Sequence, residues 1–376
     1  MDDPEPTPGK MEGHSHDNSR LYMAAGNQYI NIVVSEPTAG SGKSGHVPPA
    51  RATPLRAVGL GASCIDFSYA QDGGPIAVVP RESKEVLVRH VAEGYLERIA
   101  HDLEDRMQNS GSYGGRHWVR HHCASVDISS DGTSLMVRSN EEEIFFWRLT
   151  SRGHYLQWRR RMSGRLAINP SGATFAIGGG KRGVDLYDAD GPARVRTFGT
   201  RTALQGLLFS PDGRRLISWG YGGDIHVADV ESETVAHVLH HGEVAIPPRG
   251  FVRRLASWVN SKAVLYGVTC SERGEILASA GVDGFVRAWR LDERVPVQLE
   301  PLRPATPVAS LVISSDGRTL ATATGADMHI WDLASGEMIK TLSFPDLVTC
   351  LLFDGVTNAF IAACGGKLIP YPQGQC

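Results

Sequence analysis

The chain has 376 residues, of which 41% are hydrophobic and 21% are charged. These are ordinary values for a globular protein, and the formal net charge of −3 excludes binding of a polyanion through bulk electrostatics alone. No apolar run approaches the roughly 20 residues needed to cross a bilayer, so we expect no membrane contact. The opening residues MDDPEPTPGK contain neither a basic nor an apolar segment, so no secretory signal is expected.

The cysteines favour a reduced, cytoplasmic protein. Five of the six, at positions 64, 123, 270, 350 and 364, stand in apolar strand-like runs, which is how small buried hydrophobic residues are placed. No two of them have the CxxC spacing of a metal site. We therefore expect a cytoplasmic location, no metal and no other cofactor.

Residues 1–53 are predicted to form a tail. Residues 1–20 and 35–53 are rich in Pro, Gly, Ser, Asp and His and are expected to be disordered. The segment between them, 21–34, reads LYMAAGNQYINIVV and alternates at its end, so it can add as a strand to an exposed sheet edge, in this chain or in another. A loosely ordered segment, or an extra strand packed on the main domain, is the favoured interpretation. The segment also resembles a short N-terminal motif of some actinobacterial signalling and defence proteins, which implies an actinobacterial source.

Residues 54–376 contain a repeat. Each copy has an apolar run, a tight turn, a second apolar run and a third run that holds an aromatic residue. The gaps between successive turn glycines are 59, 40, 41, 61, 43 and 38 residues, and four of them lie near the roughly 40–45-residue period of a β-propeller blade. The turn glycines are Gly73, Gly132, Gly172, Gly213, Gly274, Gly317 and Gly355.

A second set of regularly spaced positions supports the repeat that the turn glycines define. Counting 14 to 16 residues from each turn glycine leads to a fixed position in the third run, where five of the seven residues are Trp or Tyr. Accidental turns would not keep this phase, and helical periodicity is absent across the repeats, so we predict an all-β, seven-bladed propeller. The seven positions are Val88, Trp147, Tyr187, Ala228, Trp289, Trp331 and Tyr371.

Three of the copies resemble WD repeats. They read FSPDGRRLISWG from 209, ASAGVDGFVRAWRLD from 278 and SSDGRTLATATGADMHIWDLASGEMIKTL from 314. Trp331–Asp332 is a true WD pair, and Asp283 stands six residues before Trp289, where the family places its turn aspartate. The resemblance implies a propeller that binds other proteins. Because the Gly-His dipeptide of the family is not found in its place, we expect its Asp–His–Ser/Thr–Trp hydrogen-bond network to be mostly incomplete.

The last repeat has three strand-like runs and needs a fourth. Residues 54–60, PLRAVGL, precede the first inner run and have the phase of an outer strand. We predict that this N-terminal strand completes the last blade and closes the ring, which removes the open sheet edges.

Two repeats carry long insertions, at about 102–118 and 241–262. Both follow an outer strand and precede an inner one, so they should lie on the same face of the propeller. In the second insertion, Phe251, Leu255 and Trp258 follow helical spacing, with Arg253 and Arg254 beside that stripe. Aromatic and Arg side chains dominate binding hot spots, so the predicted partner-binding residues are Phe251, Arg253, Arg254 and Trp258. The plainer alternative is a short helix whose apolar stripe packs inward.

Signals for catalysis or ligands are weak. The GSGKS run has Pro37 where a phosphate-binding loop needs glycine. The cluster His117, His121, His122 and Cys123 lacks an evident completing carboxylate and is interpreted as surface histidines leading into a strand. The segment 152–165 has five arginines with Tyr155 and Trp158, a pattern that can hold nucleic acid, but a solvated outer strand is favoured.

The sequence therefore predicts a non-catalytic adaptor or sensor that binds protein partners of unknown identity. The first alternative is an enzyme or ligand-binding protein that uses the central channel. The second, which is weaker, is nucleic-acid binding through the arginine-rich rim. The oligomeric state cannot be read from the chain.

Overall fold

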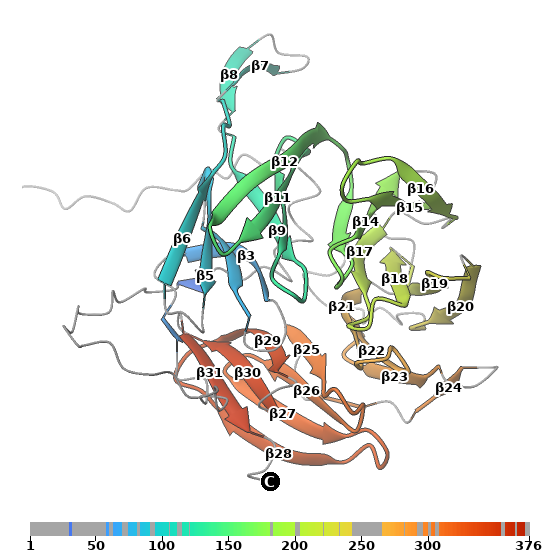
Figure 1. Ribbon diagram of the computed structural model, residues 1–376. Coiled ribbons are helices and arrows are strands. Elements are labelled where there is room, and N and C mark those ends of the chain that lie inside the picture. The colour runs from blue at the N-terminus through green and yellow to red at the C-terminus, as the bar shows by residue number, and fades with distance from the viewer. Residues whose placement is uncertain are drawn as a thin grey trace, which may run out of the picture.

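The repeated strands form seven sheets arranged in a ring (Figure 1). The ring has the predicted seven-bladed, all-β architecture. The computed structural model describes residues 30–31, 58–59, 63–69, 74–80, 83–90, 95–104, 106–110, 115–119, 121–180, 183–199, 204–220, 222–232, 234–242, 265–281, 283–291, 296–299, 302–304, 308–354, 358–364 and 367–372.

Each blade is an antiparallel sheet whose first strand in sequence is the innermost. Blades 1 to 3 consist of β3 (Ser63–Tyr69), β4 (Ile76–Pro80), β5 (Glu85–His90) and β6 (Tyr95–Ala100); β9 (Cys123–Ile128), β10 (Ser134–Ser139), β11 (Glu143–Thr150) and β12 (Gly153–Arg161); and β13 (Arg165–Ile168), β14 (Thr174–Gly180), β15 (Gly183–Asp188) and β16 (Arg194–Phe198).

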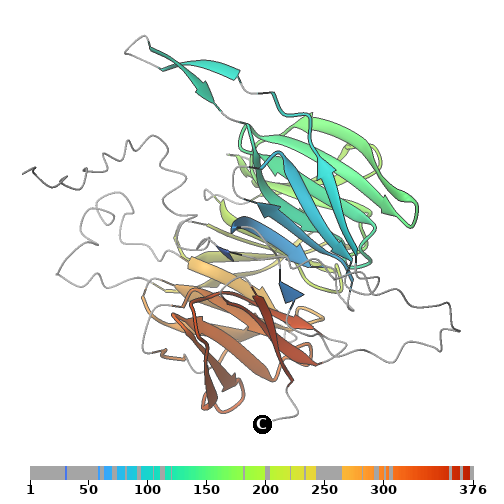
Figure 2. The same ribbon diagram turned by 90° about the vertical axis from the view of Figure 1, so that its left-hand side faces the viewer.

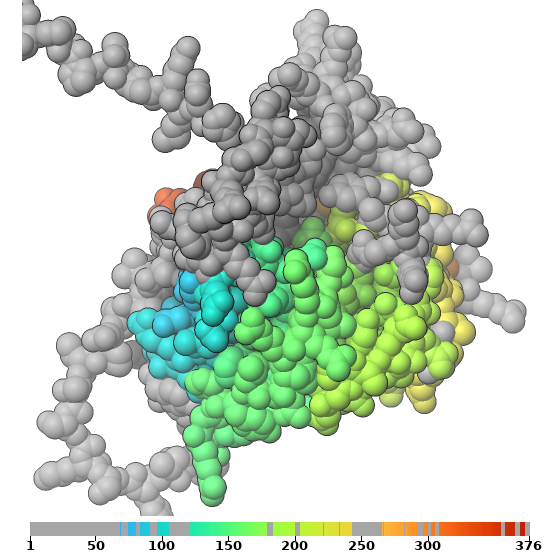
Figure 3. Space-filling view, turned by 90° about the horizontal axis from the view of Figure 1, so that it is seen from above, coloured from blue at the N-terminus to red at the C-terminus, as the bar shows by residue number. Residues whose placement is uncertain are grey.

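Blades 4 to 7 repeat the plan. They consist of β17 (Leu204–Phe209), β18 (Arg215–Gly220), β19 (Asp224–Asp229) and β20 (Thr234–His240); β21 (Leu265–Cys270), β22 (Ile276–Gly281), β23 (Val286–Arg290) and β24 (Val297–Gln298); β25 (Ser310–Ile313), β26 (Thr319–Thr324), β27 (Asp327–Asp332) and β28 (Met338–Ser343); and β29 (Val348–Asp354), β30 (Ala359–Cys364) and β31 (Lys367–Pro372). In the space-filling view blades 1 to 4 lie side by side around the rim (Figure 3).

The turn between the first two strands of a blade explains the glycine spacing. In blade 2 the N–H of Gly132 donates to the Ser129 carbonyl at 2.9 Å, and Gly132 has a φ of +70°, a conformation that costs glycine little. Asp131 holds the turn by accepting bonds from Ser129 Oγ at 2.6 Å and from the Thr133 N–H at 3.0 Å. The same positive φ occurs at Gly172, Gly213, Gly274 and Gly317.

The seven positions that lie 14 to 16 residues after the turn glycines are all in the third strand of their blade. Each faces a residue of the second strand across the ladder, and in the five blades where this third-strand position is Trp or Tyr, the residue opposite is a buried Leu or Phe. The constant distance from the turn follows, because a hairpin of fixed loop length fixes its own register. The five pairs are Leu135↔Trp147, Phe175↔Tyr187, Leu277↔Trp289, Leu320↔Trp331 and Phe360↔Tyr371.

The hydrophobic core lies between blades rather than within them. Among the described residues, an apolar cluster joins each of the six successive pairs from blades 1–2 to blades 6–7. Between blades 2 and 3 four aromatic rings follow one another, with Phe146, Trp158, Phe175 and Tyr187 at centroid distances of 5.2 to 5.3 Å. Neighbouring blades are therefore held together mainly by shared side chains.

Four short strands lie outside this plan. Two of them, β7 (Arg106–Ser110) and β8 (Gly115–Val119), form a two-stranded ribbon within the first insertion that stands away from the ring (Figures 1 and 2). A third, β2 (Val58–Gly59), pairs antiparallel with β31 through Val58↔Leu368 and Gly59↔Lys367. It falls within the predicted closing segment 54–60, whose other residues lie outside the described ones. The fourth, β1 (Ile30–Asn31), pairs with β3.

Within the part of the chain that the structure describes, no helix has the length and apolar character needed to cross a membrane.

Candidate functional site

Both long insertions begin at a buried histidine. Strand β6 ends at Ala100 and β20 at His240, and the next residues, His101 and His241, are 5% and 0% exposed. The N–H of His101 donates to the Lys84 carbonyl at 2.9 Å, and that of His241 to the Gly223 carbonyl at 2.8 Å. Each insertion therefore leaves the ring from a fixed point.

His241 is held by a polar network in blade 5. Its Nδ1 lies 2.5 Å from Ser279 Oγ and its Nε2 3.2 Å from Asp283 Oδ1, while Arg287 donates to the other Asp283 oxygen at 2.5 Å. Burial alone would raise the pKa of Asp283, but the bonds from His241 and Arg287 outweigh it and lower the pKa to about 2. Burial lowers the pKa of His241, and Asp283 offsets only part of this effect.

This network is an exception to the hydrogen-bond network that the sequence predicted to be mostly incomplete. Asp283, His241 and Ser279 are bonded to one another, and the ring of Trp289 lies edge-on to His241 at a centroid distance of 6.5 Å. The Asp–His–Ser part of the WD network is thus present in blade 5. The histidine escaped detection because the second insertion separates it from β21, so it does not stand directly before an inner strand.

His101 occupies the matching position before blade 2. The indole Nε1 of Trp147 donates to His101 Nε2 at 3.0 Å, so the neutral imidazole carries its proton on Nδ1, 3.7 Å from Cys123 Sγ. Burial lowers the pKa of His101 to about 4 and raises that of Cys123 to about 12. The first insertion is therefore held by an uncharged, buried contact, as burial of an unpaired charge would be costly.

The two fixed points lie on one face of the propeller. Strands alternate in direction within every blade, so all connections from an outer strand to the next inner strand emerge on the same side. We call this side the insertion face; the connections that follow β6 and β20 begin on it, at His101 and His241. The blades concerned, 1 and 4, are three steps apart in a ring of seven. The predicted contact residues Phe251, Arg253, Arg254 and Trp258 lie outside the described residues.

The other predicted positions can be located. Trp147 lies in β11, Tyr187 in β15, Trp289 in β23, Trp331 and Asp332 in β27, and Tyr371 in β31; Asp283 lies in the turn before β23. Trp331 Nε1 donates to Thr322 Oγ1 at 2.9 Å, and Asp332 accepts from the N–H groups of Ala334 and Ser335. These contacts hold blades and turns in place and lie within blade 6.

A second candidate site is a cavity of about 370 Å³ between the inner strands of blades 1 to 4. It lies at the turn end of the channel, opposite to the insertion face, because its lining includes the last residues of these strands and the turns that follow them. Polar and apolar groups contribute about equally to its lining. The polar lining residues are Ser68, Ser125, Asp127 and Ser130.

Asp127 links three inner strands at this cavity. Its Oδ1 accepts from Ser68 Oγ of β3 at 2.8 Å and from its own neighbour Ile128 N–H at 3.0 Å, and its Oδ2 accepts from the Ile168 N–H of β13 at 2.8 Å. Burial raises the pKa of Asp127 to about 6 even though these three bonds lower it. The sequence offered no signal for this carboxylate, since its partners lie 59 and 41 positions away.

Most of the arginine-rich segment 152–165 is the exposed outer strand β12, as expected, whereas Arg165 begins the inner strand β13. Two of its five arginines have a carboxylate nearby, since Arg159 lies 3.0 Å from Glu143 and Arg161 lies 3.9 Å from Glu141, and Arg160 donates to the Pro192 carbonyl at 3.3 Å. This arrangement disfavours a phosphate-binding rim.

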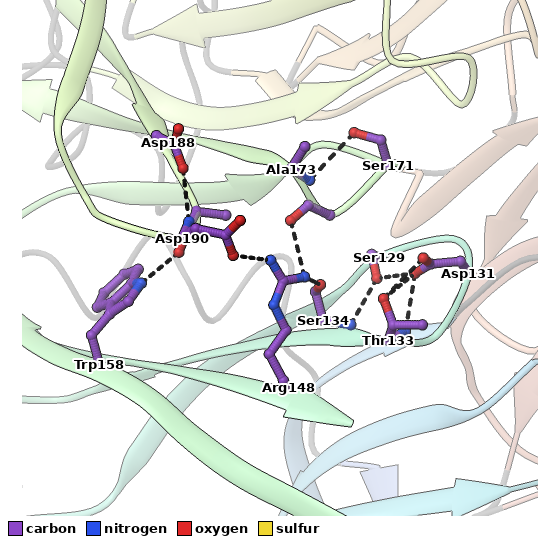
Figure 4. A network of polar contacts seen from close by, with 12 residues as sticks. Ser129, Asp131, Thr133, Ser134, Arg148, Trp158, Ser171, Ala173, Asp188 and Asp190 are labelled. Atoms are coloured by element: carbon purple, nitrogen blue, oxygen red, sulfur yellow. Dashed lines mark hydrogen bonds and ion pairs between the residues drawn. The ribbon is translucent and has the colours of Figure 1, made fainter. Parts of the chain in front are cut away.

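An arginine of the neighbouring strand β11 is also bonded within the chain. Arg148 of β11 bonds to Ser134, to the Gly172 carbonyl and, at 2.5 Å, to Asp190, so it joins blades 2 and 3 (Figure 4). This side chain therefore stabilises the contact between blades 2 and 3.

The histidine cluster near position 120 does not form a metal centre among the described residues. There, no group of three or more His, Cys, Asp or Glu side chains is arranged to hold a metal ion. His121 is buried with its Nε2 4.0 Å from Glu141, whereas Cys123 faces His101. The side chain of His117 lies outside the described ones.

Fold and repeat together define the class: the chain is a seven-bladed, all-β propeller whose repeats resemble WD repeats. No family model matches it. It is similar to the WD repeat-containing protein slp1 of Schizosaccharomyces pombe, with 25% identity over 197 residues, which cover 52% of this chain and 36% of slp1. The chain thus matches little more than a third of that relative.

The fold is also that of a chain in the crystal structure of the mitotic checkpoint complex. The TM-score is 0.62 at 16% sequence identity, and the superposition covers 91% of this chain and 98% of the other. At this identity the likeness shows the fold.

Proposed function

We propose that this propeller is a non-catalytic protein-interaction platform whose partner binds on the insertion face. The observation that carries the proposal is the pair of buried histidines, His101 and His241, from which the two insertions leave. Recognition loops work best when a rigid scaffold positions them. The similar fold within the mitotic checkpoint complex supports a role in assembling proteins.

The contact itself is assigned to Phe251, Arg253, Arg254 and Trp258 of the second insertion. Aromatic and Arg side chains together provide area and directional hydrogen bonds, which is why they recur at binding hot spots. The ribbon β7–β8 supplies a second arm three blades away. An isolated two-stranded ribbon is marginally stable in water, so a partner that covers it would stabilise it.

The test is charge reversal of Arg253 and Arg254 to Glu, followed by quantitative recovery of partners from a lysate of the native cell. We expect loss of the main partner with an unchanged thermal melt. The matched control is Arg214→Glu with Arg318→Glu, two exposed arginines in the turns of the opposite face, which should recover the partner fully. If both double variants recover the same proteins in equal yield, the insertion face is not the binding surface.

A second candidate function is binding of a small molecule in the channel cavity beside Asp127. The cavity volume of about 370 Å³ falls within the range of ligand sites, and the carboxylate favours a ligand that offers hydrogen-bond donors. Mass spectrometry of the protein under native and then denaturing conditions would detect a co-purified molecule. Its release only on unfolding, and its loss in Asp127→Ala, would support this function.

Two structural proposals accompany the function. Residues 54–60 complete blade 7, which the pairing of Val58 and Gly59 with β31 supports. The protein works in the reduced cytoplasm, which is consistent with free cysteines at 123, 270, 350 and 364 among the described residues. The actinobacterial source implied by residues 21–34 stays a prediction.

A further inference from the structure

The sheet of blade 1 has one strand more than the sheets of the other blades. Strand β1 pairs antiparallel with β3, with Ile30 opposite Cys64 and Asn31 opposite Ser63. Because β3 is the inner strand of its blade, this extra strand lies on the channel side of the ring. Within the described part of the chain, the sheets of the other six blades have four strands each.

The edge that β1 occupies is a natural acceptor for an extended peptide. An inner strand presents unpaired backbone N–H and C=O groups to the channel, and such an edge pairs readily with any suitable strand. The residues around β1 read YINIVV from 29 to 34, and β-branched residues are enriched in strands. The acceptor and a matching strand are therefore present in one chain.

We infer that the inner edge of β3 is a peptide-binding site and that its occupant is the chain's own segment 21–34. The contact lies at the start of β3, which is the end nearest the insertion face. The tail thus enters the channel from the side on which the insertions emerge. This inference does not depend on where a protein partner binds.

The register gives the site a direction. Pairing is antiparallel, so each step back along the tail advances one residue along β3. Continued in this way, the pairing brings position 26 opposite Ser68, whose side chain lines the channel cavity. A tail bound along the whole edge and a small molecule in the cavity would then exclude each other.

The native Cys64 allows a direct test in the full-length protein. Residues directly opposite in an antiparallel pair have Cα atoms about 4.5–5.5 Å apart, within the range of about 4.4–6.8 Å that a disulfide requires. Ile30→Cys should therefore form a disulfide with Cys64 under mild oxidation. The product is identified by non-reducing digestion and mass spectrometry of monomeric protein.

Ile32→Cys is the matched control, because it makes the same substitution two residues away. Diagonal neighbours lie about 7–8 Å apart, beyond disulfide range, so its cross-link to Cys64 should form at least about tenfold more slowly. Asn31→Cys with Ser63→Cys tests the next pair of the same register and serves if Ile30→Cys fails to fold.

Three outcomes decide the inference. A fast link between position 30 of the Ile30→Cys variant and Cys64 in the monomer, abolished by Cys64→Ser, supports it. Equal rates for positions 30 and 32 would overturn it, because they would show that the tail has no register on β3. A link found only in covalent dimers would also overturn it, since the occupant would then be the tail of a second copy.

Discussion

The Nε2 atom of His241 lies 3.2 Å from a carboxylate oxygen of Asp283, although 42 positions separate the two residues. The histidine follows the outer strand of blade 4, and the aspartate belongs to blade 5. Their contact joins the first residue of the second insertion to the blade that follows it. The position of His241 is therefore fixed by its contacts with blades 4 and 5.

The first prediction concerns the contribution of the His241–Asp283 pair to stability at low pH. The pKa of Asp283 falls from an ordinary 3.8 to about 2 on folding, so the ionised carboxylate stabilises the fold above pH 4 and this contribution is lost as the pH falls from about 4 towards 2. Asp283→Asn should destabilise the protein at pH 7, and the difference from wild type should shrink below pH 4. Urea unfolding at pH 7, 4 and 3 measures it; a constant difference at all three would contradict the assignment.

The second prediction concerns Asp127, whose pKa shifts in the direction opposite to that of Asp283. The pKa of Asp127 rises from 3.8 to about 6 on folding, so the folded state binds more protons than the unfolded chain. The stability from this group is fully present below pH 4 and is lost as the pH rises through 6. Asp127→Asn should remove this fall, which unfolding curves between pH 4 and 7.5 will show. A wild-type curve that rises over this range in step with the variant would refute it.

The third prediction distinguishes two tryptophans, the half-buried Trp147 and the buried Trp331. Trp147→Phe and Trp331→Phe each remove one indole hydrogen bond, to His101 and to Thr322 respectively, and each should cost about 1 kcal/mol of stability. Only Trp147→Phe should also accelerate tryptic cleavage within 102–118, because only His101 holds the base of that insertion. Equal cleavage rates in the two variants would mean that the histidine does not restrain it.

The fourth prediction tests how the ring closes. Deleting residues 54–60 should lower the melting temperature strongly, because blade 7 would lose the strand that pairs with β31. Deleting residues 1–20 should leave it unchanged, since polar tails carry little packing. Thermal melts of the two truncated proteins decide the matter, and equal melting temperatures would disprove closure by this segment.

The repeat was predictable because its signals are local. A turn glycine such as Gly132 and the third-strand Trp147 lie 15 residues apart within one hairpin system, and short hairpins fix their own register. The number of blades and the positions of the third strands followed from this local rule.

The sites were harder to predict because their contacts cross between blades. Asp127 meets Ser68 and Ile168 in different repeats, and His241 meets Asp283 across an insertion whose length no rule fixes. Trp147 and His101 are 46 positions apart, and nothing in the spacing of either residue names the other. Loop lengths vary freely, so sequence distance carries no information about such pairs.

Among the described residues the apolar clusters join neighbouring blades, so each blade shares its core with its neighbours. A cut of the chain between Gly242 and Leu265 would divide the cluster in which Ile217 and Leu239 of blade 4 pack with Leu265 and Leu277 of blade 5. Each fragment would then expose half of a hydrophobic surface whose complement exists only on the other. Two separately expressed fragments should consequently recognise each other and rebuild the ring, so the protein can be split at this position into two fragments that reassemble.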